Sequence, residues 1–251
     1  MPYVESDGIK IAYEEAGTGD PIVLVHGFAA SRTSNWKGAG WFDALTTSGR
    51  RVIALDCRGH GESDKPHEPH RYGDNMTADV IALLDHLGVE RCELMGYSMG
   101  GRISLSLLTE HGGRFSCAVL GGIGDMANRQ RDRAGTIAAA LEPDELPADA
   151  PDIAKGFRLF AEAGGNDLKA LAAVMRGWGP TPSDQELATI DTPTLVVVGS
   201  NDDLVGNAEP LIAKIPGARL EVIPDRDHLT VVGDERYKKA ALAFLDQHRV
   251  R

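Results

Sequence analysis

The sequence predicts an α/β fold in which helices cover both faces of a mostly parallel sheet. Short, unbroken apolar runs rich in β-branched residues recur along the chain, and helical patterns lie between them. Unbroken apolar runs are typical of strands buried on both faces, and strand–helix alternation is typical of parallel connections. With 251 residues, 42% of them hydrophobic, the chain is long enough for one large core that carries an insertion.

Six apolar runs are expected to be strands of this sheet. They cover residues 22–25, 52–55, 92–95, 117–120, 195–198 and 220–223. Ahead of them, Ile9 and Ile11 alternate with Lys10, and Asp7-Gly8 is a typical turn sequence. These first residues therefore predict a hairpin at the edge of the sheet.

Helices are expected where apolar residues repeat at helical spacing. The predicted helices lie at residues 76–87, directly after Ser98, and around residues 237–245. Residues 125–191 contain no strand-like run, but helical patterns occur at 137–141, 153–160 and 168–175. We therefore expect a core formed by residues 1–124 and 192–251, and a helical cap, or lid, at 125–191.

A candidate nucleophile lies in the segment Gly96-Tyr97-Ser98-Met99-Gly100. An apolar run precedes this Gly-x-Ser-x-Gly motif and a helical pattern follows it, which is the strand–turn–helix context that the chemistry requires. The tight turn strains the backbone and lifts the serine hydroxyl above the sheet. We therefore predict that Ser98 is the nucleophile of a serine hydrolase.

The proposed base is His228, which follows the last strand-like run by a short loop. Asp202 follows the run at 195–198 and is the proposed acid, so the chain order is Ser, Asp, His. Two alternatives to Asp202 remain open, namely the adjacent Asp203 and Asp125 after the preceding strand.

The oxyanion hole is expected where the first parallel strand ends in His26-Gly27-Phe28. Backbone N–H groups of Phe28 and Met99 would donate to the substrate oxygen. In this arrangement His26 braces the loop and is not a base.

These segments together resemble the α/β-hydrolase superfamily over nearly the whole chain. The resemblance rests on residues 22–28, on the Asp-x-Arg-Gly-x-Gly-x-Ser turn at 56–63, on the nucleophile elbow, and on the positions of Asp202 and His228. It implies the α/β-hydrolase fold with a helical cap and the serine-nucleophile, esterase-like branch. A serine nucleophile argues against the haloalkane dehalogenase and epoxide hydrolase branches. The chain departs from the family at Asp227, where glycine commonly precedes the histidine.

The predicted function is a carboxylesterase that acts through an acyl-enzyme on a small to medium ester. A carbon–carbon bond hydrolase or lactonase would use the same triad. Gly100-Gly101-Arg102 also resembles the synthases of menaquinone formation, in which such an arginine meets an acidic substrate. A ligand receptor without catalysis is a further alternative. Phe157, Phe160 and Trp178 are candidate substrate-binding residues, although their helical spacing also fits packing.

Composition disfavours several other classes of protein. With 26 basic and 37 acidic residues the net charge is −11, which is unsuited to binding nucleic acid. Cys57, Cys92 and Cys117 are too widely spaced for a zinc site or a disulfide framework, so we expect buried free thiols, no metal and no cofactor. The first residues do not show the basic start and apolar core that are typical of a signal peptide. No apolar stretch has the roughly 20 residues that span a bilayer. We expect a cytoplasmic monomer or homodimer without a membrane partner.

Overall fold

A computed structural model describes residues 1–124, 130–179 and 181–249 of the chain. Its centre is an eight-stranded sheet in the order β1-β2-β4-β3-β5-β6-β7-β8. The strands are β1 (Tyr3–Ser6), β2 (Ile9–Ala16), β3 (Asp20–Val25), β4 (Arg50–Leu55), β5 (Cys92–Tyr97), β6 (Phe115–Gly121), β7 (Thr194–Gly199) and β8 (Arg219–Ile223). The predicted hairpin is β1–β2, which joins β4 antiparallel, and all pairings from β4 to β8 are parallel. The predicted fold class is confirmed.

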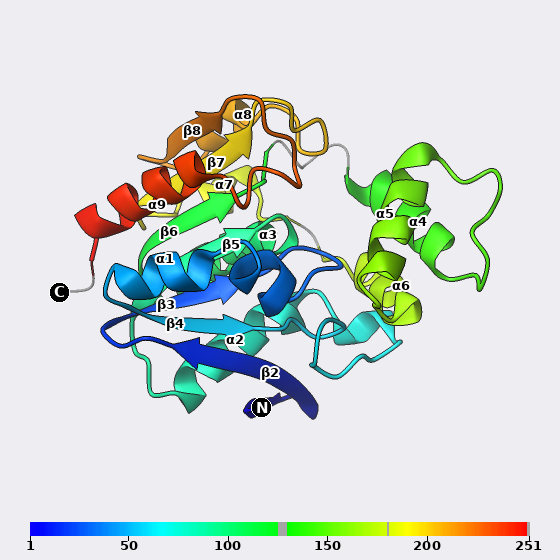
Figure 1. The fold of residues 1–251 in the computed structure, drawn as a ribbon, viewed down its shortest axis with the longest axis horizontal. Coiled ribbons are helices and arrows are strands. Elements are labelled where there is room, and N and C mark those ends of the chain that lie inside the picture. The colour runs from blue at the N-terminus through cyan, green and yellow to red at the C-terminus, as the bar shows by residue number, and fades with distance from the viewer. Residues whose placement is uncertain (125–129, 180, 250–251) are drawn as a thin grey trace.

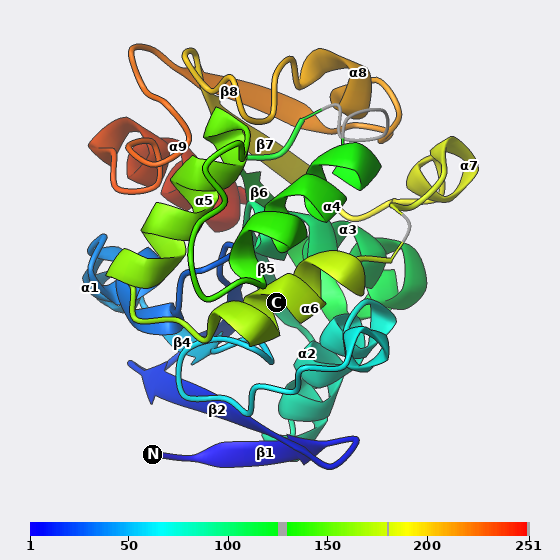
Figure 2. The ribbon, with the colours of Figure 1, turned by 90° about the vertical axis from the view of Figure 1, so that its right-hand side faces the viewer.

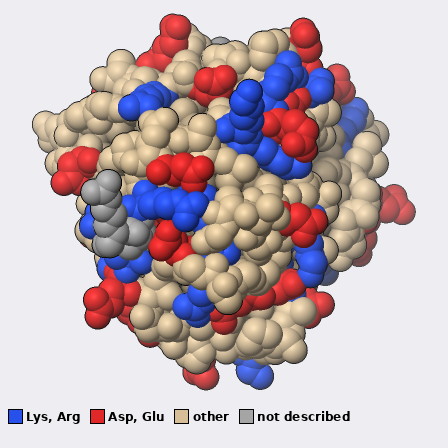
Figure 3. Space-filling model, turned by 60° about the vertical axis from the view of Figure 1, so that its left-hand side comes forward, with Lys and Arg blue, Asp and Glu red and all other residues tan. Residues whose placement is uncertain are grey.

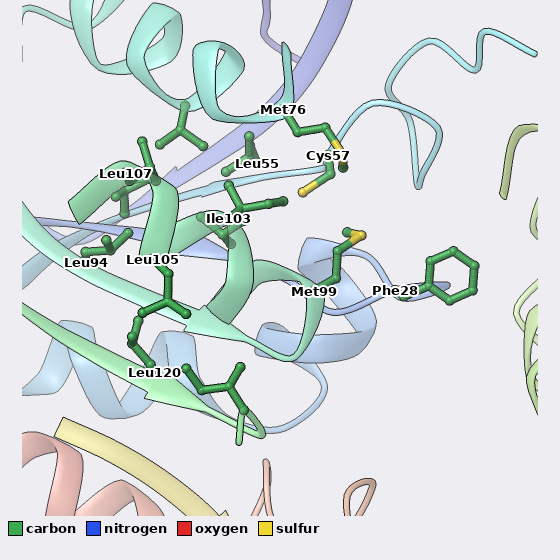
Figure 4. Close-up of a cluster of buried hydrophobic side chains, with 14 of the residues drawn as sticks. Phe28, Leu55, Cys57, Met76, Leu94, Met99, Ile103, Leu105, Leu107 and Leu120 are labelled. Atoms are coloured by element: carbon green, nitrogen blue, oxygen red, sulfur yellow. The ribbon is translucent and has the colours of Figure 1, made fainter. Parts of the chain in front are cut away.

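Helices cover both faces of the sheet (Figure 1). They are α1 (Trp41–Thr47), α2 (Asp74–His86), α3 (Met99–His111), α8 (Glu209–Ile212) and α9 (Glu235–Gln247). Alternate residues of β3 explain the two layers. Ile22 and Leu24 belong to the buried cluster with α1 and α9, whereas Val23 and Val25 belong to the cluster with α2 and α3. Figure 4 shows part of the second cluster, where Leu94 of β5 lies near Ile103 and Leu105 of α3.

Between β6 and β7, the described residues form four helices. They are α4 (Gln130–Leu141), α5 (Asp152–Ala163), α6 (Leu168–Arg176) and α7 (Asp184–Leu187). Helices α4, α5 and α6, called the inserted helices below, lie beyond the carboxyl ends of the parallel strands (Figures 1 and 2). Catalytic groups of open α/β sheets converge at this edge. The alternative acid Asp125 lies outside the described residues.

The structure differs from the sequence analysis at the last strand. The run at 220–223 predicts a strand covered on both faces, but β8 is an edge strand and Val222 is 46% exposed. The short elements η1 (Arg32–Lys37), η2 (Pro69–Arg71), η3 (Gly112–Arg114), α1, α7 and α8 had not been predicted. An element of three to seven residues holds too few turns for a helical repeat to be recognised.

The three cysteines are free and buried, as expected. Acidic and basic side chains are interspersed on the face shown in Figure 3. Within residues 1–124, 130–179 and 181–249, none of the helices combines the length and apolarity needed to cross a bilayer.

Candidate active site

Ser98 occupies the sharp turn between β5 and α3. Its backbone has φ of 53° and ψ of −110°, a left-handed conformation that is costly for a residue with a side chain. The flanking glycines make the turn possible. A Cβ at Gly100 would lie 1.9 Å from the carbonyl oxygen of Val25, and one at Gly96 would lie 2.3 Å from Ser104 Oγ. The sequence therefore folds into a strained elbow that presents the hydroxyl at the carboxyl edge.

Ser98, His228 and Asp202 form a hydrogen-bonded chain. Nε2 of His228 lies 2.9 Å from Ser98 Oγ, and Nδ1 lies 2.8 Å from Asp202 Oδ2. The Asp202 side chain is 1% exposed and the His228 side chain 12%. These distances are those of a nucleophile, its base and the group that orients the base. The structure thus brings together the three residues that the sequence analysis selected from distant parts of the chain.

The loop after β7 separates the two adjacent aspartates. Asp202 Oδ1 accepts the backbone N–H groups of Leu204 and Val205 at 3.2 and 3.3 Å, which fixes the carboxylate while Oδ2 faces His228. Asp203 is exposed, and its backbone N–H donates to the carbonyl of Asn201. Of these two neighbouring aspartates, Asp202 is therefore the one that contacts the histidine.

Asp227 stabilises the loop that carries His228. Its Oδ1 accepts the backbone N–H groups of Leu229 and Thr230 at 3.0 and 2.8 Å, and the Thr230 hydroxyl at 2.7 Å. Hydrogen bonds from Thr230 lower the pKa of this carboxyl, so it accepts them as an anion. An aspartate turn thus occupies the place where the family commonly has glycine.

The Gly27–Phe28 peptide is oriented by His26. The backbone N–H of Cys57 donates to His26 Nε2 at 2.9 Å, so Nδ1 carries the proton and donates to the carbonyl of Gly27 at 2.8 Å. In a trans peptide the N–H points opposite to the C=O, so the Phe28 N–H points away from His26. Met99 is the first residue of α3, where a backbone N–H has no intrahelical acceptor. Phe28 lines the same cavity as Ser98, and Met99 directly follows Ser98 in the chain.

Two asparagines that the sequence analysis missed hold the same loop. Asn35 Oδ1 accepts the Gly27 N–H at 2.8 Å. From the inserted region, Asn166 Nδ2 donates at 3.0 Å to the carbonyl of Ala29, whose φ is 56°. The only sequence signal for Asn35 was a polar residue in a loop after His-Gly, and Asn166 had no signal because its partner is 137 residues away.

A cavity of about 510 Å³ opens above Ser98. The core contributes Phe28, Leu204, Leu229 and Val232, and α5 contributes Ile153, Gly156, Phe157 and Phe160. The rings of Phe28 and Phe157 pack edge-to-face at 5.8 Å between centroids. Among the described residues that line the cavity, His228 is the single group that can carry a positive charge.

Trp178 lies elsewhere than expected. It does not line the cavity above Ser98 but a smaller one of about 40 Å³, together with Arg102. The Arg102 guanidinium lies 4.7 Å from the centre of the Trp178 ring and donates to the carbonyl of Gly179. Burial lowers the pKa of Arg102 to about 9. The contact between Arg102 and the segment after α6 therefore explains the position of Trp178.

Tyr97, next to the nucleophile, is a further residue that the motif did not assign. Its hydroxyl donates to the backbone carbonyl of His228, and the two rings lie 5.4 Å apart. Burial raises the pKa of Tyr97, so the phenol stays protonated as this donor.

Within the described part of the chain, no group of three or more His, Cys, Asp or Glu side chains is arranged to hold a metal ion.

Fold and site together are those of an α/β hydrolase. A model of the alpha/beta hydrolase fold family matches residues 20–170. The chain belongs to this family of hydrolytic enzymes, and the predicted resemblance is confirmed.

The relatives differ in activity. A component of the acetoin cleaving system of Pseudomonas putida, a dihydrolipoyllysine-residue acetyltransferase, is 32% identical over 92% of this chain, which spans 64% of that protein. A putative 2-succinyl-6-hydroxy-2,4-cyclohexadiene-1-carboxylate synthase of Bacillus subtilis is 28% identical and is covered over 96% of both chains. The structure of a thermophilic esterase from Thermogutta terrifontis is similar over 99% of both chains, with a TM-score of 0.80 and 26% identity. These names support the family and leave the reaction undecided.

Proposed function

We propose that the protein is a carboxylesterase, with Ser98 as nucleophile, His228 as base and Asp202 as the acid that orients the base. The observation that carries the proposal is the hydrogen-bonded chain of these three residues at the floor of an apolar cavity. The similarity to a structurally characterised esterase supports it. The inserted helices, of which α5 lines one side of the cavity, would act as the cap.

The reaction would proceed through an acyl-enzyme. His228 takes the proton of Ser98 as Oγ attacks the ester carbonyl, and the Phe28 and Met99 N–H groups receive the negative oxygen. His228 then gives the proton to the leaving alcohol. Water, deprotonated by His228, attacks the acyl-enzyme and releases the acid and free Ser98. Asp202 keeps Nδ1 protonated and stabilises the imidazolium in both steps.

The synthase alternative draws on Arg102 and on the relative from Bacillus subtilis. An acidic substrate needs a cation that faces it, but Arg102 does not line the cavity above Ser98, and its guanidinium contacts Trp178 and Gly179 instead. This placement favours an uncharged substrate. Esters and lactones are uncharged and meet that condition. The substrate of a carbon–carbon hydrolase does not meet it when it carries a carboxylate.

The test compares wild-type protein with Ser98→Ala on short p-nitrophenyl esters. We expect turnover by the wild type and a loss of at least about 10³-fold in the variant. A fluorophosphonate probe should label the wild type at Ser98 and leave Ser98→Ala unlabelled. Ester turnover that survives in Ser98→Ala would overturn the assignment. Elimination from a cyclohexadiene dicarboxylate without ester turnover would support the synthase, and labelling without any turnover would support a receptor.

A further inference from the structure

One side of the catalytic cavity is a single face of α5. Ile153, Gly156, Phe157 and Phe160 line the cavity and follow the spacing i, i+3, i+4, i+7. At this spacing the four positions lie on the same side of a helix. Three of them carry large apolar side chains, and the position between them carries none.

Gly156 is an unfavourable residue for its local structure. It lies inside α5, between Asp152 and Ala163, where glycine weakens a helix relative to alanine or leucine. Its φ is not in the left-handed region, and a Cβ added at Gly156 would have no atom within 4 Å. Neither backbone conformation nor close packing therefore requires glycine here. Gly156 lines the cavity, and a side chain at this position would enter open space there.

The cavity wall is largely apolar, and the polar residues that line it are Ser34, Asn35, Tyr97, Ser98 and His228. Phe28 and Leu229 of the core face the same cavity as Phe157 and Phe160 of α5. Burial of hydrocarbon against such side chains is favourable, whereas a carboxylate or an ammonium would lose its hydration without a partner.

We propose that the cavity binds the hydrocarbon chain of a neutral, medium-chain ester, and that Gly156 is a specificity-determining residue that keeps the room for this chain. The proposal rests on the esterase function. A side chain at position 156 fills the space next to Phe157 and Phe160, so it excludes long chains while the carbonyl still reaches Ser98.

The experiment measures chain-length preference in Gly156→Leu and Gly156→Ala. The matched control is Gly135→Leu, because Gly135 lies inside the inserted helix α4, has no atom within 4 Å of an added Cβ, and does not line the cavity. Both leucine substitutions favour the helix. Thermal unfolding verifies that each variant folds. Each protein is assayed with p-nitrophenyl acetate and octanoate, which vary the acyl chain, and with ethyl and octyl acetate, which vary the alcohol chain.

We expect Gly156→Leu to lower the octanoate-to-acetate ratio of kcat/KM, or the octyl-to-ethyl ratio, by about tenfold or more. The series that responds identifies which half of the ester occupies the cavity. Gly156→Ala should give a smaller decrease, and Gly135→Leu should keep both ratios of the wild type. Unchanged ratios in Gly156→Leu, or equal changes in Gly135→Leu, would overturn the inference alone. Absence of turnover with every ester in the wild type would overturn the esterase function and this inference with it.

Discussion

The peptide between Gly27 and Phe28 is fixed from three directions. His26 donates to its carbonyl, Asn35 accepts the preceding N–H, and Asn166 holds the next residue, Ala29. A hydrogen-bond donor stabilises a transition state best when it is oriented before the reaction, because no reorganisation is then needed. We therefore propose that Asn35 is a positioning residue, which would act through Gly27 on the Phe28 N–H.

Replacement of Asn35 should weaken the stabilisation of the transition state more than the binding of the substrate. We expect Asn35→Ala to lower kcat for a p-nitrophenyl ester by about tenfold, less than complete loss of an oxyanion donor, with a small change in KM. Affinity for an alkyl boronic acid, which adds to the serine as a tetrahedral adduct, should fall in parallel with kcat/KM. The control is Asn75→Ala, because that side chain donates its hydrogen bonds to the carbonyls of His70 and Tyr72, which do not line the cavity above Ser98. A rise in KM at constant kcat would contradict the positioning role.

The order of groups along the chain predicted Ser98, Asp202 and His228, with Asp203 and Asp125 left open as alternatives to Asp202. Each follows a strand run, and parallel strands bring their carboxyl ends to one edge. Asn35 and Asn166 were not predictable in this way, because their contacts depend on the path of loops. Trp178 was predicted in the wrong cavity, since helical spacing shows that a side chain faces inward but not which cavity it reaches.

At the scale of elements, a buried ion pair ties the amino ends of β4 and β5. Arg50 Nε donates to Glu93 Oε2 at 2.6 Å, and both side chains are fully buried. Asp246 of α9 lies 3.1 Å from the same guanidinium. Desolvation raises the pKa of Glu93, although Arg50 opposes that shift. The apolar run at residues 92–95 predicts a strand that includes Glu93, and the ion pair with Arg50 makes this buried carboxylate tolerable there.

Removal of one partner should cost much more than removal of both. We expect Arg50→Met to lower the free energy of unfolding by about 3–5 kcal/mol, because Glu93 is left buried and unpaired. The double variant Arg50→Met/Glu93→Leu should recover most of this loss, since the buried charge is gone. Urea unfolding of the wild type, the two single variants and the double variant measures the coupling. Equal losses in the single and double variants would show that packing, and not the unpaired charge, sets the cost.

Elements were predictable in proportion to their length and burial. The interior strands are buried on both faces, and the helices α2, α3 and α9 each pack one apolar face against the sheet. Their sequences therefore show clear apolar runs or helical repeats. The apolar run of β8 predicted a central strand, but its position at the sheet edge depends on the order of strands, which the run itself does not encode. The inserted helices were recognised as helices, while the face of α5 that lines the cavity emerged only from the structure.

At the scale of the whole molecule, two buried histidines link stability to pH. Burial lowers the pKa of His60 to about 3 and also lowers that of His26. The rings pack against each other at 5.1 Å, and His60 packs on Phe28 at 5.8 Å. In the unfolded chain both would titrate near 6.5. The folded state thus keeps both rings neutral at a pH where the unfolded chain takes up protons.

Because the pKa values of His26 and His60 are lowered in the folded state, the protein should lose stability as the pH falls. The stabilising contribution is complete above pH of about 6.5 and is lost as the pH falls toward about 3, because protons bind preferentially to the unfolded state. Between pH 7 and pH 5, His60 alone should lower the free energy of unfolding by about 2 kcal/mol.

Urea unfolding at pH 7 and pH 5 tests this expectation in the wild type and in His60→Asn. The variant should be less stable at pH 7 because packing is lost, yet it should lose about 2 kcal/mol less on acidification. An identical pH dependence in both proteins would show that His60 does not supply the linkage. Carboxyl groups titrate in both proteins, so they do not account for a difference between the wild type and His60→Asn in the stability lost on acidification.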